Sequence, residues 1–378
     1  MQHPDSPASR LGSLNRREFL LDSALATTGM LCAVSGAPSA QSASVAREVR
    51  RTRSYQPGME YRRLGKTGLW VSAVCLGGHW KRIEKIIGSQ EAFASCEDLR
   101  GNDADLERFH RNRHDVISRC IDAGINCIDF AGAAEPYAYA RALRGRRDRM
   151  YLCWSMGAQE MRHPDHRQAR FLVGLLEKGL RETGLEYADV WRIMAHERGS
   201  LHTQAETDQM LEALTLARQR GLCRFTGIST HDRPWAKRLI ETYPDVIQVL
   251  VTPYTSQSKE LPADSLFDAI RKHDVGVLGI KPFASNSLFQ GDGSPDHAAA
   301  EADDRRARLA LRYILGNPAI TAPIPGLISV HQVDNAVRAV RERRELDLAE
   351  REELDAAGRQ MWANLPAQYR WLKDWEYV

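Results

Sequence analysis

Short apolar runs rich in branched residues alternate with amphipathic segments from Met59 to near the end of the chain. Eight of these runs predict β-strands, at residues 73–76, 126–130, 150–154, 190–194, 224–229, 246–251, 275–280 and 322–324. Between them, apolar positions spaced by three and four residues predict helices over 167–183, 206–220, 234–242, 265–273, 304–315 and 330–340. This alternation predicts an α/β domain built on a parallel sheet.

The segment before the first strand has the pattern of a β-hairpin. In YRRLGKTGLWVS, the residues Gly65-Lys66-Thr67-Gly68 form a turn-like stretch between two strand-like runs. Eight strands without a sharp change of composition predict a closed (β/α)8 TIM barrel, with this N-terminal β-hairpin covering one end. Functional residues of such barrels lie at the other end, in the loops that follow the strands. Here those loops begin at Gly77, Ala131, Ser155, Ala195, Thr230, Thr252, Lys281 and Gly326.

The N-terminal segment has the organisation of an export signal. Asn15-Arg16-Arg17-Glu18-Phe19-Leu20 precedes a modestly apolar stretch, residues 21–34, and then a run of small residues, 35–40. This order is typical of a twin-arginine signal, which directs folded proteins out of the cytoplasm. We therefore expect a periplasmic or other extracytoplasmic protein, with the twin-arginine export machinery as a partner. The predicted division is a signal peptide and linker (1–46), the barrel (47–346), and a C-terminal helix with an aromatic tail packed on the barrel (347–378).

Composition limits the classes of partner. The chain has 378 residues, of which 43% are hydrophobic and 27% charged, with a net charge of +3 and interspersed signs. This balance gives no indication of nucleic-acid binding, and no apolar run reaches the roughly 18 residues of a membrane span. The six cysteines after the signal form no CxxC pair or Cys/His cluster, so we expect no metal site. His163 and His166 have a metal-compatible spacing but no evident third ligand.

Six segments in order resemble the aldo/keto reductase family. They are YRRLGKTGLWVSAVCLGG, CIDAGINCIDFA, ALRGRRDRMYL, GLEYADVW, GLCRFTGIS and IPGLISVHQVDNAVRAV, and the resemblance extends from Met59 to about Val340. It implies reduction of a carbonyl group with NAD(P)H by an Asp, a Tyr, a Lys and a His. In this family the Tyr donates the proton, the Lys lowers the pKa of the Tyr, the Asp holds the Lys, and the His orients the carbonyl.

Only the aspartate of this tetrad is present, as Asp129. Ala134 occupies the tyrosine position, or Gly132 does when the count starts from the far side of the shortened loop. Ser155 stands in the lysine position and Met194 in the histidine position. The resemblance therefore implies a reductase barrel without three of its four catalytic side chains.

We predict a rebuilt catalytic site of Asp129, Lys81, Tyr137 and His196. Lys81 would supply the missing cation, and Tyr137 would donate the proton because the shortened loop moves it inward. His196 lies two residues beyond the vacant histidine position, on the same side of an extended chain. Asp129 at a strand end needs a partner, for which Lys81 or His79 is the candidate. The alternative is that these side chains are solvated loop residues.

The cofactor positions are better preserved. Ser229 and Gln248 resemble the family's contacts to the nicotinamide amide, and Gly326, Gln332 and Asn335 resemble its contacts to the pyrophosphate and adenine. The resemblance implies NAD or NADP as cofactor. Neither Leu327 nor Ile328 is an Arg or Lys that would bind a 2′-phosphate, which favours NAD.

Export has a consequence for the reaction. Outside the cytoplasm no pool of soluble NAD(P)H exists, so we expect a tightly bound cofactor that is recycled within the site. The substrate would be a small molecule with a carbonyl or polyol group, such as a sugar. Two alternatives stay open: acid–base chemistry without hydride transfer by Asp129, Glu135, His196 and Glu197, and a ligand-binding protein without catalysis.

Overall fold

The computed structural model describes residues 40–93, 95–101 and 103–373. Residue contacts divide the chain into two units, 1–46 and 47–378. The first described helix is α2 (Ala40–Arg50). The twin-arginine motif and the apolar stretch of the predicted signal lie outside the described residues.

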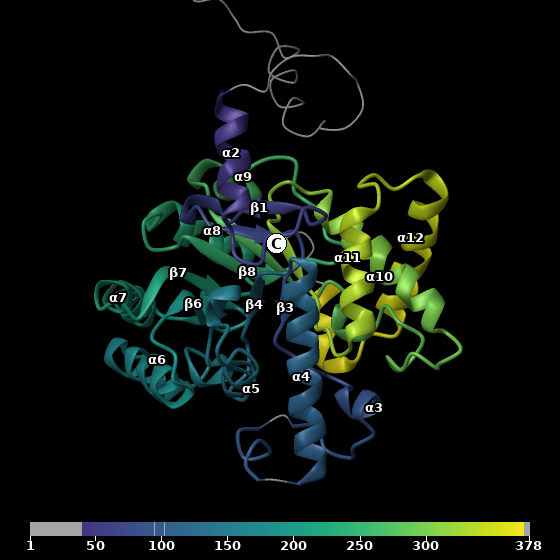
Figure 1. Ribbon diagram of the computed structural model, residues 1–378. Helices are drawn as coiled ribbons and strands as arrows, with labels where there is room; N and C mark the ends of the chain where they lie inside the picture. The colour runs from purple at the N-terminus through teal and green to yellow at the C-terminus, as the bar shows by residue number, and fades with distance from the viewer. Residues whose placement is uncertain (1–39, 94, 102, 374–378) are drawn as a thin grey trace, which may run out of the picture. The chain divides into compact units, whose positions relative to one another are not determined.

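Eight parallel strands form one sheet in chain order, which confirms the predicted barrel (Figure 1). The strands are β3 (Leu76–Gly77), β4 (Cys127–Asp129), β5 (Tyr151–Trp154), β6 (Ala188–Met194), β7 (Cys223–Ser229), β8 (Val249–Pro253), β9 (Gly276–Ile280) and β10 (Ala322–Ile324). The first and last strands meet through a bridge between Gly77 and Gly326, and the Gly77 amide donates to the Pro325 carbonyl at 2.7 Å. These contacts close the barrel.

Two strands begin three residues later than predicted. The first begins at Leu76 rather than residue 73, because the Ser72 hydroxyl donates to the Val74 carbonyl at 2.7 Å and the chain bends there. The sixth begins at Val249 rather than residue 246, because Val246 is held in a turn by the Tyr243 carbonyl. Apolar runs show where a strand lies, but these local hydrogen bonds decide where it starts.

Helices between the strands form the outer layer. They are α4 (Ala104–Ala123), α5 (Glu135–Ala142), α6 (Ala169–Thr183), α7 (Gln204–Gln219), α8 (Arg233–Thr242), α9 (Leu266–His273), α10 (Ala300–Leu315) and α11 (Val330–Arg341). The polar segment after β3 also contains a short helix, α3 (Ile83–Ile87). The six predicted helices match α6 to α11 with small shifts at their ends.

The hairpin packs at the amino-terminal end of the barrel. Its strands β1 (Tyr61–Arg63) and β2 (Trp70–Ser72) pair antiparallel, as predicted. The Lys66 amide donates to the Asp274 carbonyl at 2.7 Å, just before β9 begins. A Cβ atom on Gly65 would lie 2.2 Å from the Gly276 amide, so glycine is required at this contact. The carboxyl ends of the strands, at the other end, are left for the functional site.

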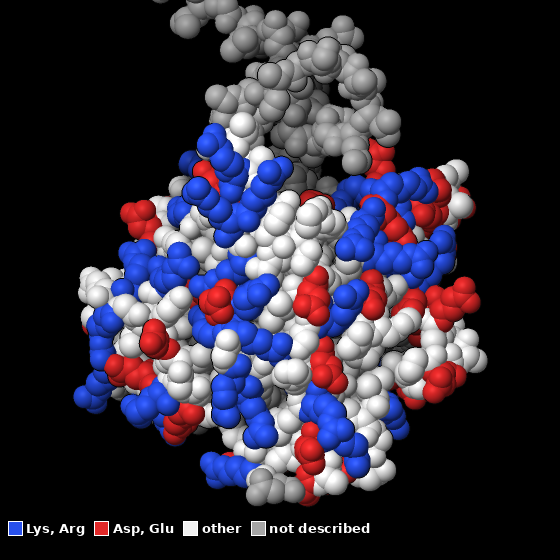
Figure 2. Space-filling view, in the orientation of Figure 1, with Lys and Arg blue, Asp and Glu red and all other residues white. Residues whose placement is uncertain are grey.

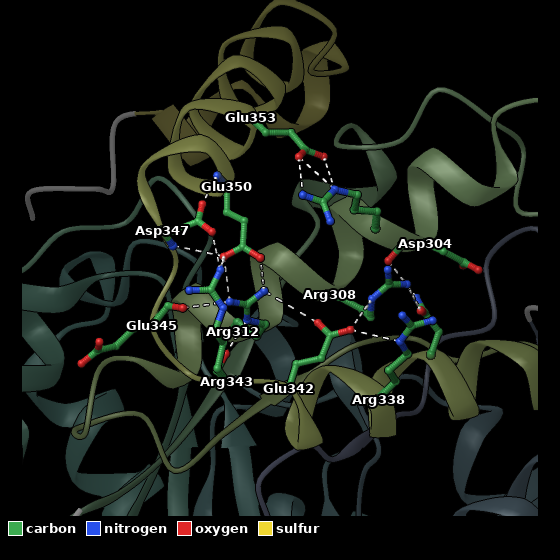
Figure 3. A network of polar contacts seen from close by, with 12 residues as sticks. Asp304, Arg308, Arg312, Arg338, Glu342, Arg343, Glu345, Asp347, Glu350 and Glu353 are labelled. Carbon is green, nitrogen blue, oxygen red and sulfur yellow. Dashed lines mark hydrogen bonds and ion pairs between the residues drawn. The ribbon is translucent and has the colours of Figure 1, made fainter.

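The C-terminal region packs on the outer helices through a small apolar core and an ionic network. Helix α12 (Leu348–Ala363) is followed by a 3-10 segment, η7 (Ala367–Lys373). Arg312 on α10 is 2% exposed and forms two 2.9 Å hydrogen bonds with the Glu350 carboxylate on α12 (Figure 3). Arg305 and Glu353 form a second pair between the same helices at 2.8 Å. These contacts fix α12 and therefore the start of η7.

Charges of both signs are interspersed on the face of the molecule seen in Figure 2. Among the helices that the structure describes, none combines the length and the apolar character that a membrane crossing needs.

Candidate functional site

Two adjoining cavities open near the carboxyl ends of the barrel strands. The barrel cavity encloses about 1380 Å³, including its part open to solvent, and contains Asp129, Arg192 and Ser229 in its wall. The side groove encloses about 830 Å³ by the same measure and runs along α10 and the start of α11. Four residues line both spaces: Lys81, Phe283, Asn286 and Gly326. The two spaces together have the size that a dinucleotide and a small substrate need.

Asp129 is held by Arg192, a residue that the sequence analysis did not select. Arg192 donates to both carboxylate oxygens, from Nε at 2.9 Å and from Nη2 at 2.7 Å. Both side chains are at most 2% exposed. Burial raises the pKa of Asp129 and Arg192 opposes that rise, while the carboxylate keeps the arginine charged by raising its pKa.

The alternation of β6 explains why Arg192 reaches Asp129. Val190, Arg192 and Met194 share the inward face of this strand, since side chains two apart point the same way. Arg192 therefore lies one layer below Met194, the residue predicted to occupy the histidine position. Its Nη1 atom is buried and has no hydrogen-bond partner among the described residues. In the sequence, Arg192 could have been identified as a partner of Asp129 because it is the one arginine in the apolar run DVWRIM, and a buried charge requires a partner.

A buried carboxylate, Glu160, lies beside Ser155, the residue predicted to occupy the lysine position. The Ser155 hydroxyl donates to Glu160 at 2.6 Å, and the Met194 amide and the Trp191 indole donate to the same carboxylate at 2.7 and 3.2 Å. Burial raises the pKa of Glu160. Because these donors come from β5, β6 and the following loops, Glu160 ties the two strand ends together and needs no cation in direct contact.

His79 and Glu135 form a further pair at the edge of the barrel cavity. His79 Nδ1 contacts the Glu135 carboxylate, which also accepts from the Ala131 amide at 2.6 Å. The histidine side chain is 53% exposed, whereas that of Glu135 is 5% exposed. Glu135 raises the pKa of His79. Burial opposes ionisation of Glu135, but His79 and backbone amides outweigh it and lower the pKa of the carboxyl.

Lys81 contacts the C-terminal segment rather than Asp129. Its ammonium donates to the Tyr369 hydroxyl at 2.5 Å and to the Ser285 hydroxyl at 2.8 Å, and it lies 4.6 Å from the centre of the Tyr369 ring. Burial opposes ionisation of Tyr369, but the hydrogen bond from Lys81 outweighs it and lowers the pKa of the phenol. Tyr369 and Lys81 both line the barrel cavity. A tyrosine and a lysine thus meet there, although the tyrosine comes from η7.

The structure does not bring the other two predicted catalytic residues into this cavity. The Tyr137 hydroxyl on α5 donates to Glu182 on α6, and burial raises the pKa of the phenol. The His196 amide donates to His202 at 2.9 Å, and the ring Nδ1 accepts from the Arg198 amide at 3.2 Å. Neither residue is part of the barrel cavity's wall. Tyr137 is directed outward because α5 already begins at Glu135, so residue 137 follows helical rather than extended geometry.

The predicted cofactor residues divide between the two spaces. Ser229 lines the barrel cavity, Gln332 and Asn335 line the side groove, and Gly326 lines both. Gln248 lines neither space. It precedes β8 at the amino-terminal end of the barrel, where its side-chain oxygen accepts from the Thr226 amide at 3.2 Å.

Four residues of the loop after β9 have left-handed backbones. Lys281, Ala284, Ser285 and Asn286 have φ angles of 58°, 45°, 57° and 71°. Such angles in residues other than glycine cost of order 1–3 kcal/mol each and persist where a site requires them. Three of the four, Lys281, Ser285 and Asn286, line the barrel cavity. Lys281 lies at the start of a predicted loop, but its sequence context indicates no role for it.

No group of three or more metal-ligating side chains occurs in the described part of the chain. The rings of His163 and His166 stack on each other with centres 3.8 Å apart, and His166 Nδ1 lies 2.7 Å from the Gln159 carbonyl oxygen.

Comparison with known proteins assigns the family. The model of the aldo/keto reductase family matches residues 103–359, more than half of the chain. A solved aldo-keto reductase from Bacillus halodurans in its holo form has 22% identity and a TM-score of 0.54, with 82% of this chain and 99% of that chain covered. One from Klebsiella pneumoniae in complex with NADPH has 21% identity and a TM-score of 0.56, with 82% and 96% covered. On the family match and this barrel, the chain belongs to the aldo/keto reductase family.

Proposed function

We propose that this chain is an NAD(P)-dependent oxidoreductase acting on a carbonyl or hydroxyl group of a small, sugar-like molecule. The observation that carries the proposal is the pair of adjoining cavities. The side groove contains the family's nucleotide positions, and the barrel cavity contains a tyrosine–lysine pair together with Asp129 and Arg192. A family barrel that had lost its chemistry would not require these buried charges at the strand ends.

The residues of the side groove fit a dinucleotide. Gln332 lies in the first turn of α11, where the helix dipole favours a phosphate. Gly326 has no room for a side chain, because a Cβ atom would lie 2.7 Å from the His79 carbonyl oxygen. We assign Gly326, Gln332 and Asn335 to the phosphates and adenosine, and Ser229 to the nicotinamide amide. Bound there, the nicotinamide supplies the hydride chemistry. The absence of a basic residue at 327 and 328 favours NAD.

Tyr369 is the proposed proton donor. The Lys81 ammonium stabilises the phenolate that forms when the proton leaves, which is the role the family assigns to its missing lysine. Arg192 keeps a positive charge at the cavity wall, where it favours a developing alkoxide, and Asp129 keeps Arg192 in position. In this assignment Asp129 and Lys81 keep catalytic or positioning roles, and Tyr369 takes the role first predicted for Tyr137.

We further propose that the protein is exported folded, with the nucleotide already bound. The support is the Arg16-Arg17 signal and the absence of a soluble nicotinamide pool outside the cytoplasm. A tightly bound cofactor then has to be regenerated within the site, so a substrate that is oxidised and reduced again is favoured. Replacing both arginines by lysine should abolish export in a fractionation experiment, while cytoplasmic protein still folds.

Nucleotide content tests the proposal directly. Purified protein is denatured and the supernatant analysed for NAD and NADP, and stripped protein is titrated with both by calorimetry. We expect binding that Gly326→Ala weakens at least tenfold, because the new methyl group meets backbone. Gly174→Ala on α6 is the control, since a Cβ atom there meets nothing within 4 Å. If neither nucleotide is released or bound, the oxidoreductase proposal is wrong and non-redox or ligand-binding functions take its place.

A further inference from the structure

The barrel cavity contains more positive than negative side chains. Four cations, Lys81, Arg162, Arg192 and Lys281, line it, against two carboxylates, Asp129 and Glu197. Both carboxylates are already paired, Asp129 with Arg192 at 2.7 Å and Glu197 with Arg162 at 3.0 Å. The two lysines therefore have no carboxylate partner among the described residues.

Lys281 differs from Lys81 in having no polar partner. Among the described residues, its ammonium forms no hydrogen bond or ion pair. It instead lies 5.4 Å from the centre of the Tyr369 ring and 5.7 Å from that of Trp371. A lysine in this position is held by its stem and by the ring faces, while the ammonium stays available to the cavity.

The backbone of Lys281 also points to a specific role. Its φ angle of 58° lies in the left-handed region, and Pro282 follows, although an extended conformation is usual before proline. This conformation begins the loop at the carboxyl end of β9, where functional residues of a barrel lie. Within the described part of the chain, no hydrogen bond or ion pair of the ammonium balances this strain, and its contacts are with the two aromatic rings.

Arg162 also lines the cavity. Its Nε donates to the Ala195 carbonyl at 3.2 Å and its Nη1 pairs with Glu197, while Nη2 has no partner among the described residues. Burial lowers the pKa of Lys281 to about 8. Among the neighbouring groups, Tyr369 and Glu197 oppose this shift, whereas the charges of Lys81 and Arg162 add to it. Like charges brought together in a cavity favour an anion between them.

From these contacts we infer that Lys281, with Arg162, binds a carboxylate group of the substrate, so that the molecule converted here is an acid such as a sugar acid rather than a neutral sugar. This inference depends on the proposed oxidoreductase function only in that it calls the bound molecule a substrate. Binding of the anion can be measured without turnover. One ammonium and one free guanidinium nitrogen match the two oxygens of a carboxylate. Trp371 and Tyr369 line the same cavity, so a molecule held by Lys281 and Arg162 would lie beside aromatic side chains.

The test compares two sugars that differ in one group. Full-length protein, with and without saturating nucleotide, is titrated by calorimetry with glucuronate, glucose and inorganic phosphate. We expect glucuronate to bind at least tenfold tighter than glucose. Lys281→Met, which keeps the stem over the rings, should reduce this ratio to less than threefold, whereas Lys281→Arg should preserve it. Lys272→Gln, on the last turn of α9, removes an exposed charge and should leave the ratio unchanged.

Four results overturn the inference: equal binding of the two sugars, an unchanged ratio in Lys281→Met, binding of phosphate without discrimination between the sugars, or weaker nucleotide binding in Lys281→Met with glucuronate binding intact. The last result would assign the ammonium to the cofactor. If Lys281→Met fails to fold, as judged by circular dichroism, Lys281→Gln replaces it. Discrimination without nucleotide binding would refute the oxidoreductase proposal alone, and nucleotide binding without discrimination would refute this inference alone.

Discussion

Two buried aspartates at opposite ends of the barrel show how differently similar charges are used. Asp189, near the start of β6, is 0% exposed, and Asp129, at the end of β4, is 1% exposed. Three arginines surround Asp189: Arg53 at 2.9 Å, Arg147 at 2.9 Å and Arg224 at 3.3 Å. The Leu152 amide adds a hydrogen bond at 3.0 Å.

Among the described residues, Asp129 pairs with one arginine, Arg192, and also accepts a hydrogen bond from Cys153. One buried nitrogen of Arg192 has no partner in the described part of the chain. The arginines around Asp189 are partly exposed, with 17%, 23% and 46% of their side chains accessible to solvent. The difference indicates that the Asp189 cluster stabilises the fold, whereas in the Asp129 pair one nitrogen of Arg192 can still form a hydrogen bond near the cavity. This matches the general division of such barrels into a stabilising end and a functional end.

The largest expected effect lies at the functional end, at Tyr369. Tyr369→Phe removes the proposed proton donor, so the rate of turnover should fall about 100- to 10,000-fold, with nucleotide binding unchanged. Tyr137→Phe is the matched control, because its hydroxyl contacts Glu182 between two outer helices, and it should leave turnover unchanged. Steady-state kinetics of the two variants measure the rate of turnover of each. A loss confined to Tyr137→Phe would restore the first prediction and refute the role of Tyr369.

Breaking the Asp129 pair should cost the most stability. Arg192→Met leaves a buried carboxylate without its partner and should lower the free energy of unfolding by about 3–5 kcal/mol. Urea denaturation measures the loss. The double variant Asp129→Leu with Arg192→Met should recover most of it, because two apolar side chains replace the pair. If the double variant is as unstable as the single one, the arginine stabilises the barrel through contacts other than Asp129.

Removing the charge of Asp189, at the amino-terminal end of the barrel, should lower stability less than breaking the Asp129 pair and should not affect turnover. Asp189→Asn keeps the shape but loses charged hydrogen bonds, so the free energy of unfolding should fall by roughly 1.5–3 kcal/mol. The three arginines around residue 189 are partly exposed to solvent, which limits the loss. Turnover per folded molecule should equal that of the parent protein when both are assayed well below the melting temperature. A selective loss of turnover would contradict the division between the two ends.

The smallest effect concerns His79 and Glu135. The pKa of His79 is raised above 6.5 and that of Glu135 is lowered below 4.5, so both are charged between these shifted values. The pair is lost when pH rises through the raised pKa of His79 or falls through the lowered pKa of Glu135. His79→Gln should therefore lower stability near pH 6 by less than about 1 kcal/mol, since the histidine is half-exposed. The difference should vanish at alkaline pH in thermal melts, and its persistence there would exclude an ionic origin.

The C-terminal segment is where sequence and structure diverge most. The tail aromatics were predicted to pack on the barrel, yet Tyr369 also lines the barrel cavity and meets Lys81. No local pattern could show this, because the contact joins positions separated by 288 residues. It depends on α12 being held against α10 by pairs such as Arg312 with Glu350 (Figure 3). The position of η7 is thus a property of the packed helices.

The spacing of apolar residues was sufficient to predict the barrel, its hairpin and most helix boundaries. Burial of one face of a helix or strand imposes a repeat that can be recognised in the sequence alone. The ordered segments were also sufficient to identify the family. The partner of Asp129, the neighbours of Lys81 and the exposure of Lys281 to the cavity were settled only in three dimensions. Charged side chains select partners by distance and desolvation, and both depend on how strands from distant parts of the sequence meet around the barrel axis.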